Sequence, residues 1–197
     1  MRGIVRGAAI ATAFVLLAST AQAQSVNPIS FGVAGGMSFP TGEDRDYVKN
    51  GYHGEVMMGI HLPTAPVWFR VEGFYHKFSA KEGYGDGSAR VLGGAGNVMW
   101  DMPSAGMVKV YLTAGGGVYN IKQEAEVPVV VTDQRLRLGV QTETVEAKDT
   151  KFGVNGGLGV RFTMAGINPF VEARYHSVFT EGESTNVIPV TVGIMFR

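Results

Sequence analysis

The segment PFVEARYHSVF, residues 169–179, alternates two kinds of side chain along its length. The apolar and aromatic set is Val171, Ala173, Tyr175 and Phe179. The polar set is Glu172, Arg174 and His176. Because successive side chains of a strand point to opposite faces, this alternation predicts a β-strand with one apolar face and one charged face. A single strand of this kind fits both a soluble barrel and a membrane barrel, so other segments must decide between them.

The same alternation recurs along most of the chain. It predicts seven further strands at 29–39, 52–62, 67–78, 90–102, 108–122, 151–163 and 187–196. The facing of 108–122 stays open, because glycines occupy both of its sides. Strands of about 9–13 residues suit a tilted crossing of a bilayer, and an even number closes an antiparallel sheet with no free edge. We therefore expect an all-β fold, an eight-stranded antiparallel up-and-down transmembrane β-barrel.

Charged residues fall on one face of several strands, beside glycines that leave room for them. Such charges are costly against lipid and acceptable in a polar lumen, which favours a membrane barrel over a soluble, lipocalin-like one. The predicted lumen network comprises Glu55, Arg70, Glu72, His76, Lys151, Arg161, Glu172, Arg174 and His176. Its mixed signs predict ion pairs that fill the narrow interior of eight strands. A narrow gated path for small solutes remains an alternative.

The connections between the predicted strands alternate between long and short. Membrane barrels have short periplasmic turns and longer extracellular loops, so both termini should lie on the periplasmic side. The connection 123–150 is too long for a plain loop. Its β-branched run Val127–Val131, followed by turn residues 132–134 and a further alternating run, predicts a β-hairpin that projects outside the membrane.

The N-terminus predicts export. Arg2 and Arg6 precede an apolar run at 8–18, and small residues precede a cleavage site after Ala23. This is the form of a secretory signal peptide, residues 1–23, which leaves residues 24–197 as the barrel domain. The removed segment holds two arginines and no acid, so the formally neutral chain becomes a mature protein of charge −2. That charge gives no electrostatic case for nucleic acid.

Several segments resemble the OmpA/OmpX-like small outer-membrane β-barrels, over essentially the whole mature chain. They are 109–119, 152–160, 168–175 and the closing strand 189–196. The resemblance implies that Phe196 is a recognition signal for the outer-membrane assembly machinery, with Arg197 trailing it by one residue. It also implies periplasmic chaperones, and outer-membrane lipid and lipopolysaccharide, as partners.

Candidate chemistry is sparse. Some barrels of this kind modify lipid A with His and Ser, but the neighbours His176 and Ser177 should face opposite sides of their strand and fail the geometry of an activated nucleophile. The absence of cysteine excludes thiolate chemistry and cysteine-ligated metals. His53, His61, His76 and His176 share the predicted inner face, where hydrogen bonds to carboxylates are favoured over a metal site. We expect no enzyme activity and no cofactor.

The expected role is structural or surface-interacting. The outward loops, 123–150 above all, would contact the surroundings, with a partner that the sequence does not identify.

Overall fold

The computed structural model describes residues 28–42, 44–62, 65–81, 87–104, 106–132, 138–180 and 184–197. The predicted signal peptide therefore lies outside the described residues. Eight strands and one short helix follow each other along the chain: β1 Ile29–Thr41, α2 Asp44–Tyr47, β2 Gly51–His61, β3 Val67–Ser79, β4 Gly87–Asp101, β5 Val108–Thr132, β6 Leu138–Phe162, β7 Ile167–Phe179 and β8 Ser184–Phe196. Among the described residues, no helix has the length and apolarity to cross a membrane.

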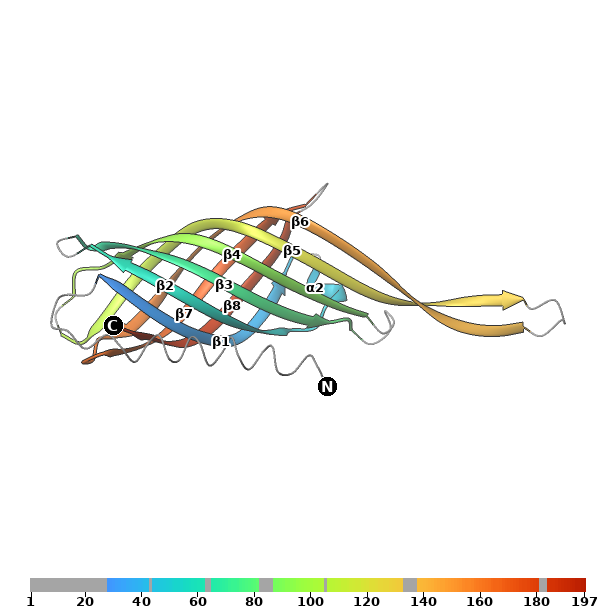
Figure 1. Ribbon diagram of the computed structural model, residues 1–197, viewed down its shortest axis with the longest axis horizontal. Coiled ribbons are helices and arrows are strands. Elements are labelled where there is room, and N and C mark those ends of the chain that lie inside the picture. The colour runs from blue at the N-terminus through green and yellow to red at the C-terminus, as the bar shows by residue number, and fades with distance from the viewer. Residues whose placement is uncertain are drawn as a thin grey trace.

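Each strand pairs antiparallel with its neighbours in sequence, and β8 returns to β1 to close the barrel (Figure 1). The closing ladder runs from Phe31 opposite Phe196 to Thr41 opposite Asn186. The predicted eight-stranded antiparallel up-and-down barrel is confirmed. Closure matters in a bilayer because an open sheet edge would leave backbone groups without hydrogen-bond partners.

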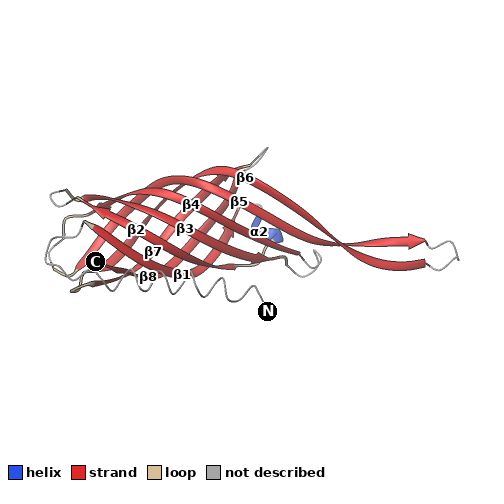
Figure 2. Ribbon diagram, in the orientation of Figure 1, coloured by secondary structure: helices blue, strands red, loops and turns tan. Residues whose placement is uncertain are grey.

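The two ends of the barrel differ. One end, here called the turn end, carries the short connections after β2, β4 and β6, together with Phe196 at the end of β8. Gly106 and Gly166 adopt positive φ angles of 93° and 80° in two of these turns, a conformation that glycine adopts at no steric cost. The opposite end is called the hairpin end, because β5 and β6 extend far beyond the other strands there (Figure 2).

The β5–β6 hairpin is continuous with the barrel wall. The two strands stay paired from Val108 opposite Phe162 up to Thr132 opposite Leu138. The sequence predicts barrel strands at 108–122 and 151–163 and a hairpin extension in the connection between them. In the structure β5 and β6 run without a break from the barrel into this hairpin, and each has 25 residues. Most of the turn expected at 132–134 lies outside the described residues.

Aromatic side chains on the outer face form two belts. Phe31, Phe69, Trp100, Phe162 and Phe196 lie within two residues of the strand ends at the turn end, and all are exposed. Tyr52, Tyr75, Phe152 and Tyr175 lie eight to ten residues from the same strand ends and are also exposed. The two belts are thus about eight residues apart, and at about 3.3 Å per residue and a tilt of about 40° this is roughly 20 Å, close to the apolar band of a membrane barrel.

Glycines inside the wall make room for lumen side chains. A Cβ added to Gly157 would strike the backbone oxygen of Ala173 and the side chain of Arg174. A Cβ added to Gly159 would strike the ring of Tyr111. These glycines therefore let long side chains from neighbouring strands lie flat against the inner wall.

Gly157→Ala should lower the free energy of unfolding by about 1–3 kcal/mol, because the added methyl group overpacks the lumen against backbone. The matched control is Gly156→Ala, whose Cβ would lie 3.6 Å from the nearest atom, an ordinary contact. Urea titration of the detergent-folded protein, followed by the loss of gel heat-modifiability, measures both variants. Equal effects of the two changes would contradict this account of Gly157.

Candidate functional site

The barrel interior is filled by side chains that alternate inward along each strand. On β3 the inward series is Trp68, Arg70, Glu72, Phe74, His76 and Phe78, and all six are buried. On β7 it is Asn168, Phe170, Glu172, Arg174, His176 and Val178, again all buried. Side chains of the two series contact each other across the lumen and form successive layers from the turn end to the hairpin end.

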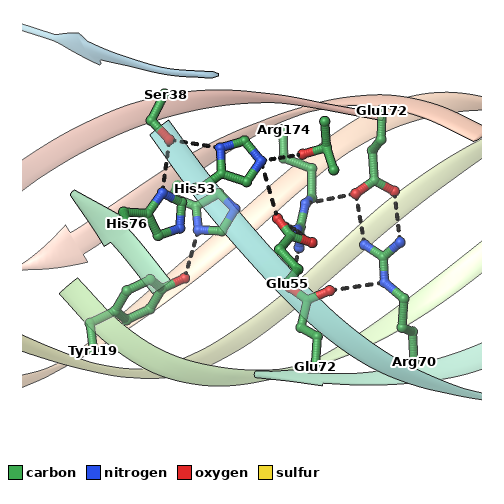
Figure 3. Close-up of polar contacts among 11 residues, drawn as sticks. Ser38, His53, Glu55, Arg70, Glu72, His76, Tyr119, Glu172 and Arg174 are labelled. Atoms are coloured by element: carbon green, nitrogen blue, oxygen red, sulfur yellow. Dashed lines mark hydrogen bonds and ion pairs between the residues drawn. The ribbon is translucent and has the colours of Figure 1, made fainter. Parts of the chain in front are cut away.

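The layer at mid-height is a network of five ionisable side chains (Figure 3). The Arg70 guanidinium donates to both carboxylate oxygens of Glu172, at 3.0 and 2.8 Å. Its Nε also lies 2.9 Å from Glu72 Oε2. Arg70 is thus held by one carboxyl group on its own strand and by another across the lumen.

Arg174 joins the rest of this network. Its Nη2 donates to both oxygens of Glu55 at 3.0 Å, its Nη1 contacts Glu72, and its Nε lies 2.8 Å from Glu172. All five side chains are at most 1% exposed. Two guanidinium groups thus meet three carboxyl groups, an arrangement that compensates buried charges which would be costly alone.

A second layer of hydroxyl groups and imidazole rings lies on the hairpin side of this network. Ser38 Oγ is 3.0 Å from His53 Nδ1 and 2.8 Å from His76 Nδ1. His53 Nε2 is 2.9 Å from Thr191 Oγ1. The sequence favours carboxylates as partners for these histidines, and the structure corrects this, because hydroxyl groups are the closer partners. His53 also lies 3.6 Å from a carboxylate, that of Glu55.

His176 completes this layer. Its Nδ1 lies 3.0 Å from the Tyr119 hydroxyl, and its ring packs edge-on against Phe74 with centroids 6.0 Å apart. Ser177 stands on the opposite face of β7, so the two side chains do not form a nucleophile–base pair. Within the described residues, no group of three or more histidine and acidic side chains has the geometry of a metal site.

The layer at the turn end combines one ion pair with aromatic rings. Arg161 Nη2 lies 2.7 Å from Asp101 Oδ2, and the indole nitrogen of Trp68 donates to the same carboxylate at 3.2 Å. The ring of His61 stacks on Trp68 with centroids 4.6 Å apart. Trp68 also joins this layer to an apolar cluster on the network side, which contains Met57, Met99, Tyr111, Phe170 and Met195.

The structure therefore divides the predicted lumen residues into groups. Glu55, Arg70, Glu72, Glu172 and Arg174 form the central network; His76 and His176 belong to the hydroxyl–imidazole layer; Arg161 lies in the layer at the turn end. Lys151 belongs to none of these, since its Nζ lies 2.9 Å from Asp149 Oδ2 toward the hairpin end. The hydrogen bond from Lys151 lowers the pKa of the Asp149 carboxyl. Sequence reasoning missed Ser38, Tyr119 and Thr191.

The sequence matches the model of the outer membrane protein beta-barrel domain over residues 10–196. The chain belongs to this family. This outer-membrane barrel therefore turns its apolar face toward lipid, as the aromatic belts indicate, and keeps its charged face inside.

Two solved structures share the fold of this outer-membrane barrel. Neisserial surface protein A has a TM-score of 0.56 at 12% identity, with 86% of this chain and 97% of that chain covered. A major outer membrane protein from Thermus thermophilus also has a TM-score of 0.56, at 13% identity, with 85% and 98% covered. No curated protein matches the sequence at a significant level.

Arg70→Met should lower the free energy of unfolding by about 3–5 kcal/mol, because it leaves the three buried carboxyl groups of the network with Arg174 as their one guanidinium partner. Arg90→Met is the matched control. Arg90 also pairs with a glutamate, Glu124, at 3.0 Å, but its side chain is 40% exposed, so its loss should cost less than about 1 kcal/mol. Urea unfolding in detergent micelles distinguishes the two, and equal losses would contradict the buried network as the source of stability.

Proposed function

We propose that this protein is exported through a signal peptide cleaved after Ala23 and acts at the bacterial surface through the β5–β6 hairpin. In this proposal the hairpin end faces outward and the barrel is the anchor. Phe196, exposed at the turn end of β8, would serve the assembly machinery, delivered by periplasmic chaperones. Lipid and lipopolysaccharide would surround the outer face.

The observation that carries the proposal is the free backbone of the hairpin. The ladder between β4 and β5 ends at Gly87 opposite Ala125, while β5 continues to Thr132. On the other side, the ladder between β6 and β7 begins only at Gly153. Among the described residues, the outer edges of β5 from Glu126 and of β6 up to Phe152 therefore have no strand beside them, and exposed edges can accept an added strand.

The filled lumen argues against the alternative of a solute pore. The central network joins β2, β3 and β7 across the interior, with an apolar cluster on one side and the hydroxyl–imidazole layer on the other. A solute would have to break buried ion pairs to pass, which is costly. Lipid A modification is disfavoured by the opposed facing of His176 and Ser177.

Trypsin added to intact cells should cut the protein in its hairpin, because the sequence between β5 and β6 holds Arg135 and Arg137. Cleavage only after the outer membrane is permeabilised would place the hairpin on the periplasmic side and contradict the proposed orientation.

The contact role is tested by shortening the hairpin. Replacing residues 126–144 with Asn-Gly joins the paired residues Ala125 and Val145 through a two-residue turn that suits an antiparallel hairpin. The variant should keep its heat-modifiability, while adherence of cells displaying it to cultured host cells and to one another falls to the level of cells without the protein. Gly156→Ala, with an intact hairpin, is the control. Unchanged adherence of the shortened variant would refute the contact role.

A further inference from the structure

A row of basic side chains crosses the outer wall of the barrel near the hairpin end, on the side formed by β3 to β6. Its members, here called the basic row, are Lys77 of β3, Arg90 of β4, Lys122 of β5 and Lys148 of β6, and each stands directly opposite the next in the register of the sheet. Directly opposed residues share one face. The face is the outer one, because Lys77 is two residues from the exposed Tyr75 and Arg90 is two residues from the exposed Leu92.

Three like-charged pairs therefore follow one another across the wall. Like charges directly opposite each other on one face of a sheet are destabilising. Glu124 offsets part of this repulsion, since its carboxylate lies 3.0 Å from Arg90 Nη2 and 3.1 Å from Lys122 Nζ. The two outer members, Lys77 and Lys148, have no ion pair within the described part of the chain. With Glu124 included, these five side chains carry a formal net charge of +3, so an anion lying over the row would relieve the repulsion.

The opposite wall of the barrel differs. The outer positions toward the hairpin end are Ser177 and Phe179 on β7, and Asn186 and Ile188 on β8. None of these four side chains carries a charge. The basic row is thus a local feature of the β3–β6 wall. A charged ring around the barrel would suit general attraction to an anionic surface, whereas a short row on one side fits a single headgroup.

The basic row lies just beyond the aromatic belt nearer the hairpin end. Lys77 is two residues beyond Tyr75 on β3, and Lys148 is four residues beyond Phe152 on β6. At about 3.3 Å per residue and a tilt of about 40°, these offsets correspond to roughly 5 and 10 Å. The headgroup region adds about 5–7 Å to each side of the hydrocarbon core. The row is therefore at the depth where lipid phosphate groups lie.

We propose that the basic row binds one lipid headgroup that carries two phosphate groups. Neighbouring strands are about 4.8 Å apart, so the row is about 14 Å long and offers each phosphate two adjacent cations. A phosphate group carries a charge of about −1.5 to −2 near neutral pH, so two of them balance the net charge of the row. The arginine and the lysines donate charge-assisted hydrogen bonds to phosphate oxygens. The acyl chains would lie against the apolar outer face below.

The inference rests on the proposed outward orientation of the hairpin end. That orientation brings the basic row into the outer leaflet, where lipopolysaccharide is the lipid proposed to surround the barrel. The row thereby assigns to the headgroup of this lipid a defined place at the base of the β5–β6 hairpin, since Lys122 and Lys148 stand on the two hairpin strands.

The test measures lipid binding to the purified mature protein in a non-ionic detergent by native mass spectrometry. The two probes are diphosphoryl and monophosphoryl lipid A, which share their acyl chains and differ by one phosphate. Diphosphoryl lipid A should bind as one molecule per barrel and roughly tenfold more tightly, because its second phosphate engages cations that a single phosphate does not reach. Inorganic phosphate in large excess should not displace it, because the acyl chains also contribute to binding.

A double variant and a matched control locate the site. Lys77→Gln combined with Lys148→Gln removes the two outer members, and should weaken diphosphoryl lipid A roughly tenfold and abolish the preference for it. Lys109→Gln combined with Arg197→Gln removes the same charge at the turn end and should leave the preference unchanged. Heat-modifiability confirms that each variant is folded.

Equal affinity of the wild-type protein for the two lipids, or a preference that survives the changes at Lys77 and Lys148, would overturn the basic row as a site. Displacement by inorganic phosphate would overturn a lipid as its occupant. Failure of the proposed function is distinguished from these outcomes, because trypsin cleavage on cells reports the orientation separately. The shortened hairpin variant keeps all four members of the row and should bind diphosphoryl lipid A unchanged.

Discussion

The pairing of Arg70 and Arg174 with Glu55, Glu72 and Glu172 is the interaction on which the rest of this structure depends. A barrel of eight strands has an interior that side chains can fill, and its outer face must be apolar to meet lipid. Polar residues of the alternating pattern therefore have to turn inward, where isolated charges are costly. Placing two guanidinium groups among three carboxyl groups, all nearly inaccessible, satisfies both demands at once.

The glycines of the wall follow from the same constraint. A guanidinium group and a tyrosine ring cannot share one narrow lumen with a full set of side chains on every strand. Gly157 lies beside Arg174 and Gly159 beneath Tyr111, each where an added Cβ would meet these side chains. The high glycine content, 28 of 197 residues, thus reflects lumen packing as well as the curvature of the sheet.

Much of this fold could be predicted from alternation alone, because one face of each strand is apolar and the other is polar or small. Segment 108–122 was the exception. Glycines and apolar residues occupy both of its sides, so its facing could not be assigned. The structure turns Tyr111, Thr113 and Tyr119 inward. These three residues are separated by even numbers of positions, which places them on one face of the strand. That face could be assigned to the lumen only if the tyrosines were expected to bond lumen partners, as Tyr119 bonds His176.

The central network was predictable in its members and not in its pairing. Alternation puts Arg70 and Glu72 on one face, but the contact between Arg70 and Glu172 depends on where β3 and β7 meet across the lumen. Lys151 shows the same limit, since its height on β6 places it beside Asp149 and away from the network. The basic row escaped prediction because only the register of four strands brings its members side by side.

The inside-out arrangement can be tested most directly with the two tryptophans of the chain. Trp68 faces the lumen and is 3% exposed, whereas Trp100 lies in the outer aromatic belt and is 44% exposed. Single-tryptophan proteins, Trp100→Phe and Trp68→Phe, would be folded into bilayers of brominated lipid. The brominated lipid should quench Trp100 strongly and Trp68 little. Stronger quenching of Trp68 than of Trp100 would place the charged face against lipid and contradict the account.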